Sequence, residues 1–498
     1  MSGDTSVRTG WKALVSTEIK PVALACAVGV GVLCWVAPTP AGLPDNAWHL
    51  FAIFVATVVA IISKAAPMGT IAIAAMALCA GTQVLAPGDP STSAKVALSG
   101  FSDSVVWLIV SAFFVARSVI DSGLGRRMAL GFVSIFGRST LGLAYGLGLT
   151  DLVLSPFIPS NTARAGGIIY PVTKSICQSH EDDGAEVTRG GVTKRRNGVG
   201  NYLMLTGYTM NLAASTMFLT GAAPNAMAVK LAGDQGTHLS WGGWLSASVL
   251  PSAVGFALVP LIVYVFNKPD VRRTPEAPAA ARAELRELGR MTTREWITLA
   301  VFVLLIGLWV GGGSFISATP VALVGLAILL ITGALSWRSM LAEHAAWDTL
   351  TWFAALVMMG TQLNEVGFVG WFGKNVSAWL GHLGLGKWLA FVLLAAIYAL
   401  SHYLFASGTA HTASMFAVFY GVGLAIGLPA IPTLVFLAGI PTMFGCLTHY
   451  GNGPAPVFYG SGYVDVKTWW ITGTALGLMF LVVWSTIGVA WWHIIGVW

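Results

Sequence analysis

Long apolar segments separated by short polar connections run along nearly the whole chain. The main apolar segments are 21–37, 48–63, 68–85, 103–120, 244–266, 296–310, 320–335, 350–362, 432–447 and 469–494. A helix needs roughly 20 apolar residues to cross a bilayer, and helices satisfy their own backbone hydrogen bonds in lipid. The pattern predicts an all-α polytopic membrane protein with about 11 transmembrane helices.

Two polar interruptions stand inside apolar stretches that do not fit this simple plan. SPFIPSNTARAGGIIYP (155–171) lies within 141–177, and LFASGTAHTASMFAVF (404–419) lies within 388–428. The apolar arms on either side of each interruption are too short for a bilayer core of about 30 Å. We therefore predict two re-entrant hairpins, with the polar residues at their tips.

The two halves of the chain repeat one plan. Ser160 and Ser407 begin the aligned pentapeptides SNTAR and SGTAH, and they lie 407 − 160 = 247 residues apart, close to half of 498. A broken apolar segment follows each pentapeptide, FLTGAAPNA (218–226) and LTHYGNGPAPV (447–457). A hairpin and a broken helix in each half indicate the inverted repeat of a secondary transporter.

This plan divides the chain into two kinds of domain. We expect a scaffold formed by 1–137 and 295–386, with 128–136 as an interfacial amphipathic helix, and a transport domain formed by 138–266 and 387–498. The segment 267–294 is rich in Ala, Glu, Arg and Pro and is expected to be a cytoplasmic linker.

Composition and charge agree with a membrane protein. Hydrophobic residues make up 56% of the chain and charged residues 10%, where soluble domains carry about 25%, and the mean hydropathy is +0.75. The net charge of +6 comes from basic residues in connecting loops, which favours cytoplasmic loops and a cytoplasmic N-terminus. No aromatic residues alternate with them, so we expect no nucleic acid partner. We expect a multi-pass protein of a bacterial inner (plasma) membrane whose first helix is retained, because 1–37 shows no clear cleavage site.

The motifs of several enzyme classes are missing. The sequence holds no GxSxG, HExxH or GxxxxGK pattern, and its five cysteines form no CxxC pair. We therefore predict neither an enzyme, nor a metal site, nor a cofactor, although a sodium ion stays open. Other polar residues near apolar segments are compatible with helix ends, namely Asp151, Lys174, Glu365, His402 and His449.

The two polar hairpin tips and the two broken segments stand at matching positions in the halves of the chain. We expect all four to meet at one central site, because irregular backbone at membrane depth must line a cavity or be buried in protein. Half-helix N-termini, hydroxyls and amides suit the oxygens of carboxylates. Arg164 is costly inside a membrane and should face a partner or cavity, the alternative being a cation that reaches the headgroups. His411 is either its counterpart or an ordinary buried histidine.

These strings carry a resemblance to a known family. SNT at 160–162, SGT at 407–409 and the two breaks resemble the divalent anion:sodium symporter (DASS) family over nearly the whole chain. SPFIPSNTARAGGIIYP and LTHYGNGPAPVFYGSGY are similar to its branch of bacterial citrate/succinate-type antiporters and plastid 2-oxoglutarate/malate translocators.

The resemblance implies a homodimer whose transport domains move as elevators and carry dicarboxylate anions. It also implies that the tips and broken helices bind the substrate. Carried over to this chain, the substrate-binding residues are Ser160, Asn161, Thr162, Ser407, Gly408, Thr409, Thr220, Gly221, Thr448 and Gly451.

Two departures from the family pattern bear on mechanism. Gly408 stands where the first tip has Asn161, so the second tip lacks one amide. Arg164 and His411 stand where a sodium-coupled member would have neutral residues, so we hypothesise that they replace sodium as charge-compensating groups. An uncompensated cation is costly to move across the membrane, which favours sodium-independent obligatory exchange.

Other functions stay open. A sodium-coupled dicarboxylate symporter is the near alternative, and an ion channel or a membrane-embedded enzyme is the distant one. The substrate is expected among 2-oxoglutarate, malate, succinate, citrate and tartrate, since all of them offer carboxylates to the tips.

Overall fold

The fold is almost entirely helical. The computed structural model describes residues 19–179, 186–189, 192–195, 198–312, 315–382 and 387–498, so the predicted N-terminal cytoplasmic segment lies mostly outside the described residues. Six described helices are long and apolar enough to cross a membrane, and five apolar helices are shorter. The prediction of an all-helical, multi-span membrane protein is confirmed.

The chain forms two compact units, one of which runs to Ser102 and includes Asp348–Trp371. Its helices before Ser102 are α2 (Pro21–Val36), α3 (Asp45–Ile62), α4 (Met68–Gly81) and α5 (Pro90–Ala97), followed by the 3₁₀ turn η1 (Ser99–Ser102). Gly100 permits a close packing here, because a Cβ atom at this residue would lie 1.9 Å from the carbonyl oxygen of Ala354. Every candidate site residue belongs to the other unit.

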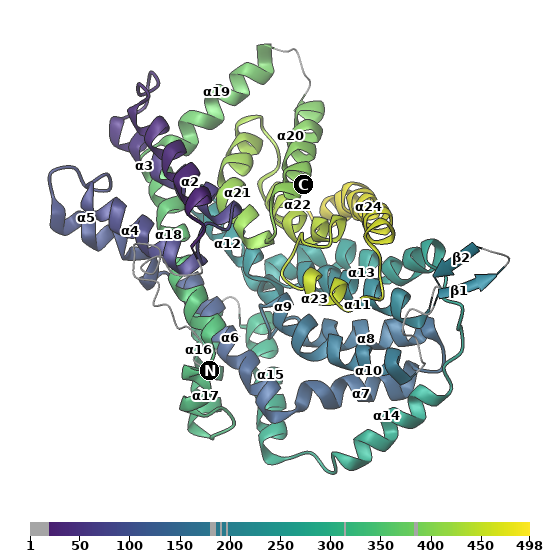
Figure 1. Cartoon of the computed structure of the whole chain (residues 1–498). Helices are drawn as coiled ribbons and strands as arrows, with labels where there is room; N and C mark the ends of the chain where they lie inside the picture. Colours follow the sequence, from purple (N-terminus) through teal and green to yellow (C-terminus); the bar gives the residue numbers. More distant parts are fainter. Residues whose placement is uncertain (1–18, 180–185, 190–191, 196–197, 313–314, 383–386) are drawn as a thin grey trace, which may run out of the picture. The chain divides into compact units, whose positions relative to one another are not determined.

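The first repeat of the larger unit contains a hairpin and a broken helix (Figure 1). Its elements are α6 (Ser104–Ser122), α7 (Leu124–Phe136), α8 (Thr140–Leu154), α9 (Asn161–Arg164), the π-helical η2 (Ala165–Ile169), α10 (Tyr170–Ser179), α11 (Val199–Met217), η3 (Leu219–Gly221), α12 (Ala223–Gly233) and α13 (Trp241–Phe266). Helix α8 has 15 residues, which gives a length of about 22 Å. That is too short for a bilayer crossing of about 30 Å, as a re-entrant arm requires.

The middle of the chain connects the repeats. It holds α14 (Glu276–Glu287), α15 (Thr293–Gly311), α16 (Ala318–Ile331), α17 (Trp337–Leu341), α18 (His344–Glu365) and α19 (Phe368–His382), the last two of which are shared between the units.

The second repeat has the same order of features as the first. Its elements are α20 (Lys387–Ser401), η4 (His402–Leu404), α21 (Gly408–Ala425), α22 (Ala430–Met443), η5 (Phe444–Leu447), α23 (Ala455–Tyr459), α24 (Val466–Val483), the π-helical η6 (Trp484–Gly488) and α25 (Val489–Ile494). The break after α22 follows Pro441, which lies inside that helix and removes one backbone donor.

Two elements were not predicted from the sequence. The polar connection 178–197 was expected to be a loop, but it contains an antiparallel pair, β1 (Glu186–Arg189) and β2 (Val192–Arg195). The linker 267–294 contains a helix, α14, to which the sequence analysis assigned no secondary structure. Its Glu, Ala and Arg residues are strong helix formers.

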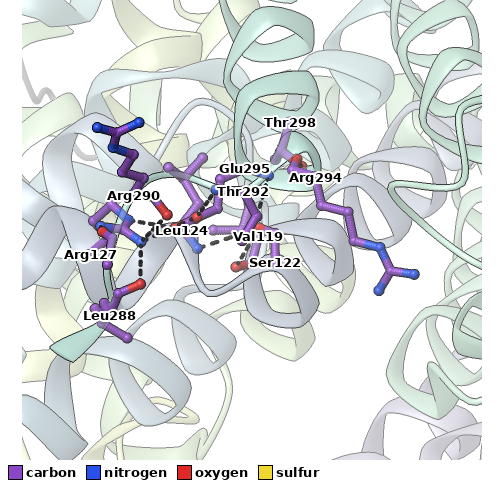
Figure 2. Close-up of polar contacts among 11 residues, drawn as sticks. Val119, Ser122, Leu124, Arg127, Leu288, Arg290, Thr292, Arg294, Glu295 and Thr298 are labelled. Carbon is purple, nitrogen blue, oxygen red and sulfur yellow. Dashed lines mark hydrogen bonds and ion pairs between the residues drawn. The ribbon is translucent and has the colours of Figure 1, made fainter.

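An ion-pair network ties α7 to the end of the linker (Figure 2). Arg127 Nε donates to Glu295 Oε1 at 2.6 Å, and its Nη1 donates to the carbonyl of Gly289 at 2.9 Å. Glu295 also accepts from the backbone N–H of Thr292 at 2.7 Å, which completes the capping box of α15. Arg127 therefore satisfies the carbonyls that follow α14 and orients the first turn of α15.

Candidate functional site

Each hairpin tip begins with a serine that caps the helix behind it. Ser160 Oγ accepts from the backbone N–H of Ala163 at 3.1 Å, and Ser407 Oγ accepts from that of Ala410 at 3.3 Å. Serine is favoured at this position because its oxygen satisfies an N–H that has no partner within the helix. The serine is therefore present in both tips because it caps a helix in each. Its hydroxyl hydrogen can still be donated to another acceptor.

The first tip packs against the second broken helix. Asn161 Nδ2 donates to Asn452 Oδ1 at 3.2 Å. A Cβ atom at Gly453 would lie 2.1 Å from Thr162 Oγ1, so only glycine permits this approach. The side chain of Thr162 is exposed, and those of Ser160 and Asn161 are half-buried. The structure therefore brings together two parts of the predicted site that lie in opposite halves of the chain.

The second tip packs against helix α22. A Cβ atom at Gly408 would lie 2.8 Å from the carbonyl oxygen of Pro441. This approach leaves no room for the asparagine side chain that the first tip carries. Gly408 is buried, whereas Ser407 and Thr409 are half-buried.

Arg164 is fully buried and paired with an acid that the sequence analysis had left as a helix-end residue. Its Nε donates to Asp151 Oδ1 at 3.0 Å, and the two side chains are 0% and 1% exposed. Asn211 Nδ2 donates to both oxygens of the same carboxylate, at 3.0 and 3.1 Å. Asp151 therefore supplies a counter-charge for Arg164 within the protein.

The remaining donors of Arg164 bind the first break. Nη1 donates to the carbonyls of Ile158 and of Gly221, the latter at 2.8 Å, and Nη2 donates to Ser215 Oγ at 2.5 Å. One guanidinium thus joins the first tip to the broken helix of its own repeat.

Thr220 is engaged in the same region. Its hydroxyl donates to the carbonyl of Pro156 at 2.5 Å and accepts from the indole N–H of Trp241 at 3.1 Å. Both bonds join Thr220 to other parts of the protein, so a direct contact from Thr220 to a substrate stays a prediction.

His411 lies against a second histidine. Its Nδ1 is 3.0 Å from Nδ1 of His402, whose Nε2 is 2.7 Å from the carbonyl oxygen of Gly451. Gly451 belongs to the second break. The position equivalent to Arg164 therefore also reaches a backbone carbonyl at a break, but through a partner ring.

Each break carries one buried polar oxygen without a hydrogen-bond partner among the described residues, Asn225 Oδ1 in the first and Thr448 Oγ1 in the second. The amide nitrogen of Asn225 donates to the carbonyls of Ser215 and Phe218. Asn225 was missed as a site residue, although it stands in the TGAAPN string of the break.

The other polar residues singled out in the sequence make separate contacts, although His449 stands within the second break. The Lys174 ammonium lies over the Tyr170 ring, Glu365 accepts from Gln362, and His449 accepts from Trp470. No group of three His, Cys, Asp or Glu residues in the described part of the chain could hold a metal ion.

Paired hairpins and broken helices within a polytopic helical chain define a membrane transporter rather than an enzyme. The model of the sodium:sulfate symporter transmembrane region matches residues 18–498, and the chain belongs to this family, which is the DASS family suggested by its motifs.

Relatives resemble the chain over almost its full length. A Bacillus subtilis protein named as a candidate malate transporter, YflS, is 44% identical over 97% of this chain and 98% of its own. The chloroplastic dicarboxylate transporter 1 of Spinacia oleracea is 41% identical over 97% of this chain and 82% of its own. The citrate/succinate antiporter of Escherichia coli (strain K12) is 35% identical over 95% of this chain and 98% of its own.

Solved structures support the fold. The Alcanivorax borkumensis YdaH transporter, described as having an unusual topology, aligns with a TM-score of 0.57 at 15% identity, over 82% of this chain and 90% of its own.

Proposed function

We propose that this protein is a secondary transporter that exchanges di- and tricarboxylate anions across a bacterial inner membrane, without sodium. The relatives named for malate, dicarboxylates and citrate/succinate support the substrate class. The half-buried Ser160, Asn161, Ser407 and Thr409 and the exposed Thr162 would contact the carboxylates. Gly408, Gly221, Thr448 and Gly451 would shape the site.

One observation supports transport without sodium. In transporters with broken helices, unwound backbone carbonyls are ligands for sodium. Here Arg164 donates to the carbonyls of Ile158 and Gly221 at the first break. His402, which contacts His411, lies 2.7 Å from the carbonyl of Gly451 at the second. These side chains occupy oxygens that a sodium ion would need.

The electrostatic case for obligatory exchange changes with the geometry. The sequence-based hypothesis assumed that Arg164 is uncompensated when the carrier is empty, but the carboxylate of Asp151 lies 3.0 Å from its Nε. Exchange is therefore supported by the relative named an antiporter, and compensation of substrate charge by Arg164 stays a proposal.

The proposed cycle keeps the division into a scaffold and a moving transport domain. Residues 138–266 and 387–498 would carry the bound anion as an elevator, in a homodimer.

Proteoliposomes that contain the purified protein test this proposal. Uptake of labelled succinate should require an internal dicarboxylate and should be unchanged when sodium is replaced by potassium. Robust uptake into vesicles without internal substrate, or strict dependence on sodium, would instead identify a sodium-coupled symporter. Counterflow into vesicles preloaded with 2-oxoglutarate, malate, succinate, citrate, tartrate or sulfate identifies the preferred anion.

A further inference from the structure

A continuous chain of polar contacts crosses the second hairpin and ends on a backbone carbonyl at each side. From the carbonyl of Gly451 it passes to His402 at 2.7 Å, to His411 at 3.0 Å and to Ser401 Oγ at 2.9 Å. Ser401 Oγ lies 2.7 Å from the carbonyl oxygen of Tyr398. The two imidazole rings are 1% and 0% exposed, so water does not supply partners.

The number of hydrogens in this chain is one too few when both rings are neutral. A carbonyl only accepts, so His402 must carry its hydrogen on Nε2. Its Nδ1 is then an acceptor, and His411 must donate from Nδ1. This leaves Nε2 of His411 as an acceptor. The single hydroxyl hydrogen of Ser401 can then be donated to only one of three acceptors, Nε2 of His411, the carbonyl of Tyr398 or Met415 Sδ at 3.3 Å. Three hydrogens serve the four contacts of the chain.

One added proton completes the chain. If His411 carries hydrogens on both nitrogens, its Nε2 donates to Ser401, and Ser401 donates to Tyr398. The same four bonds form if the extra proton is on His402, because the rings face each other through Nδ1. We infer that the His402–His411 pair is a proton-binding site, which takes up one proton when the anion binds at the tips and releases it when the anion leaves. This inference rests on the proposed anion transport.

The position of the pair explains why the two binding events are coupled. The backbone N–H of His411 donates to the carbonyl of Ser407 at 3.1 Å, so the ring lies one turn behind the second tip. A buried imidazolium near the N-terminus of α21 is unfavourable by itself, because burial and the helix dipole both oppose its charge. An anion bound at the tip offsets both effects.

No carboxylate in the described part of the chain is bonded to the pair. Among the described residues, the titratable groups on the elements packed around it are Tyr398 on α20, Tyr403 on η4, Tyr420 on α21, Cys446 on η5, His449 and Tyr450 after η5, Lys230 on α12 and Asp234 directly after α12. Lys230 and Asp234 bind each other, His449 accepts from Trp470, and the ring of Tyr398 lies 4.4 Å from that of His411. Every hydrogen-bond partner of the two imidazoles among the described residues is neutral.

The contrast with the first tip is direct. Arg164 carries a permanent charge that Asp151 balances, whereas the equivalent His411 can gain or lose its charge. Proton uptake at the second tip would offset one negative charge of the anion that binds there.

Calorimetry on the full-length protein in detergent tests the inference. Succinate binding is measured in buffers of different ionisation enthalpy, at a pH where both of its carboxylates are ionised. The slope of observed enthalpy against buffer enthalpy should correspond to uptake of about one proton per protomer. It should fall to zero in the double variant His402→Gln/His411→Asn, because either ring alone can carry the proton, and remain at one in the exposed control His344→Gln.

Each outcome decides between the two proposals. Binding with a slope of zero in the wild-type protein overturns the proton site and leaves anion transport intact. A slope of one that persists in the double variant His402→Gln/His411→Asn overturns the assignment to this pair. If this variant does not fold, the milder Ser401→Ala tests the proposal instead. A lower pH of half-maximal proton uptake on succinate binding supports the proposed chain of hydrogen bonds, and an unchanged pH contradicts it. Failure of every di- and tricarboxylate to bind overturns the proposed function instead.

Discussion

Removal of the Asp151 carboxylate should destabilise the protein strongly, because it leaves the Arg164 guanidinium buried without a counter-charge. The two groups lie 3.0 Å apart and are 0% and 1% exposed. Breaking one partner of such a pair costs about 3–5 kcal/mol. With an unfolding entropy of about 2.1 cal/mol/K per residue, the 498-residue chain has roughly 1 kcal/mol/K in all, so Asp151→Asn should lower the melting temperature by about 3–5 °C if the chain melts as one unit.

The assay is thermal unfolding of the purified protein in detergent, with succinate exchange measured in parallel. Asp151→Asn combined with Arg164→Met removes both charges, and the double variant should be more stable than the sum of the single effects predicts, by about 0.5–3 kcal/mol. Glu284→Gln is the matched control, because the Arg126–Glu284 pair is 2.8 Å long but 60% and 36% exposed. Such surface pairs contribute about 0–1 kcal/mol.

Two results would refute this reasoning. If Asp151→Asn melts like the wild type, the carboxylate is not the counter-charge of Arg164. If the two single effects simply add in the double variant, the charges do not interact in the folded protein.

Three further predictions follow from individual contacts. Arg127→Ala should lower stability by about 1.5–3 kcal/mol through lost charge-assisted hydrogen bonds, as measured by thermal unfolding, with Arg127→Lys less affected. Gly453→Ala should reduce exchange severely, since its Cβ would lie 2.1 Å from a hydroxyl of the first tip, whereas Gly307→Ala has open space and should exchange normally. Asn161→Ala should weaken succinate affinity more than Asn452→Ala, because both remove the same 3.2 Å contact but only Asn161 is proposed to contact the anion; equal losses in calorimetry would contradict that contact.

Much of the fold could be predicted from the sequence, because the features that indicate helices and breaks lie within short segments. Apolar length predicted the spanning helices, and proline and glycine marked both breaks. The 15-residue length of α8 agrees with the predicted hairpin arm. The strand pair at 186–195 was missed, since four-residue strands without alternation carry little signal.

The candidate site was less accessible because its chemistry depends on contacts between distant segments. Asp151 and Arg164 lie on different arms of one hairpin, and nothing in their spacing of 13 residues predicts an ion pair. Asn161 and Asn452 are 291 residues apart. The loss of asparagine at Gly408 is visible in the sequence, but its cause, the carbonyl of Pro441, is visible only in the fold.

The two repeats make the same kind of contact at equivalent positions, but the group that contacts the backbone carbonyl differs in charge. In the first, a permanent cation binds the carbonyls of the break and an internal carboxylate cancels its charge. In the second, a neutral ring pair binds the carbonyl of Gly451, and no carboxylate among the described residues contacts it. Asp151 balances the charge of Arg164 at the first tip, so we propose that a change in charge during the cycle arises at the second tip or on the anion itself. Duplication of the fold therefore does not imply duplication of electrostatics: the cation at the first tip is paired with a carboxylate, whereas the imidazoles at the second contact only neutral partners among the described residues.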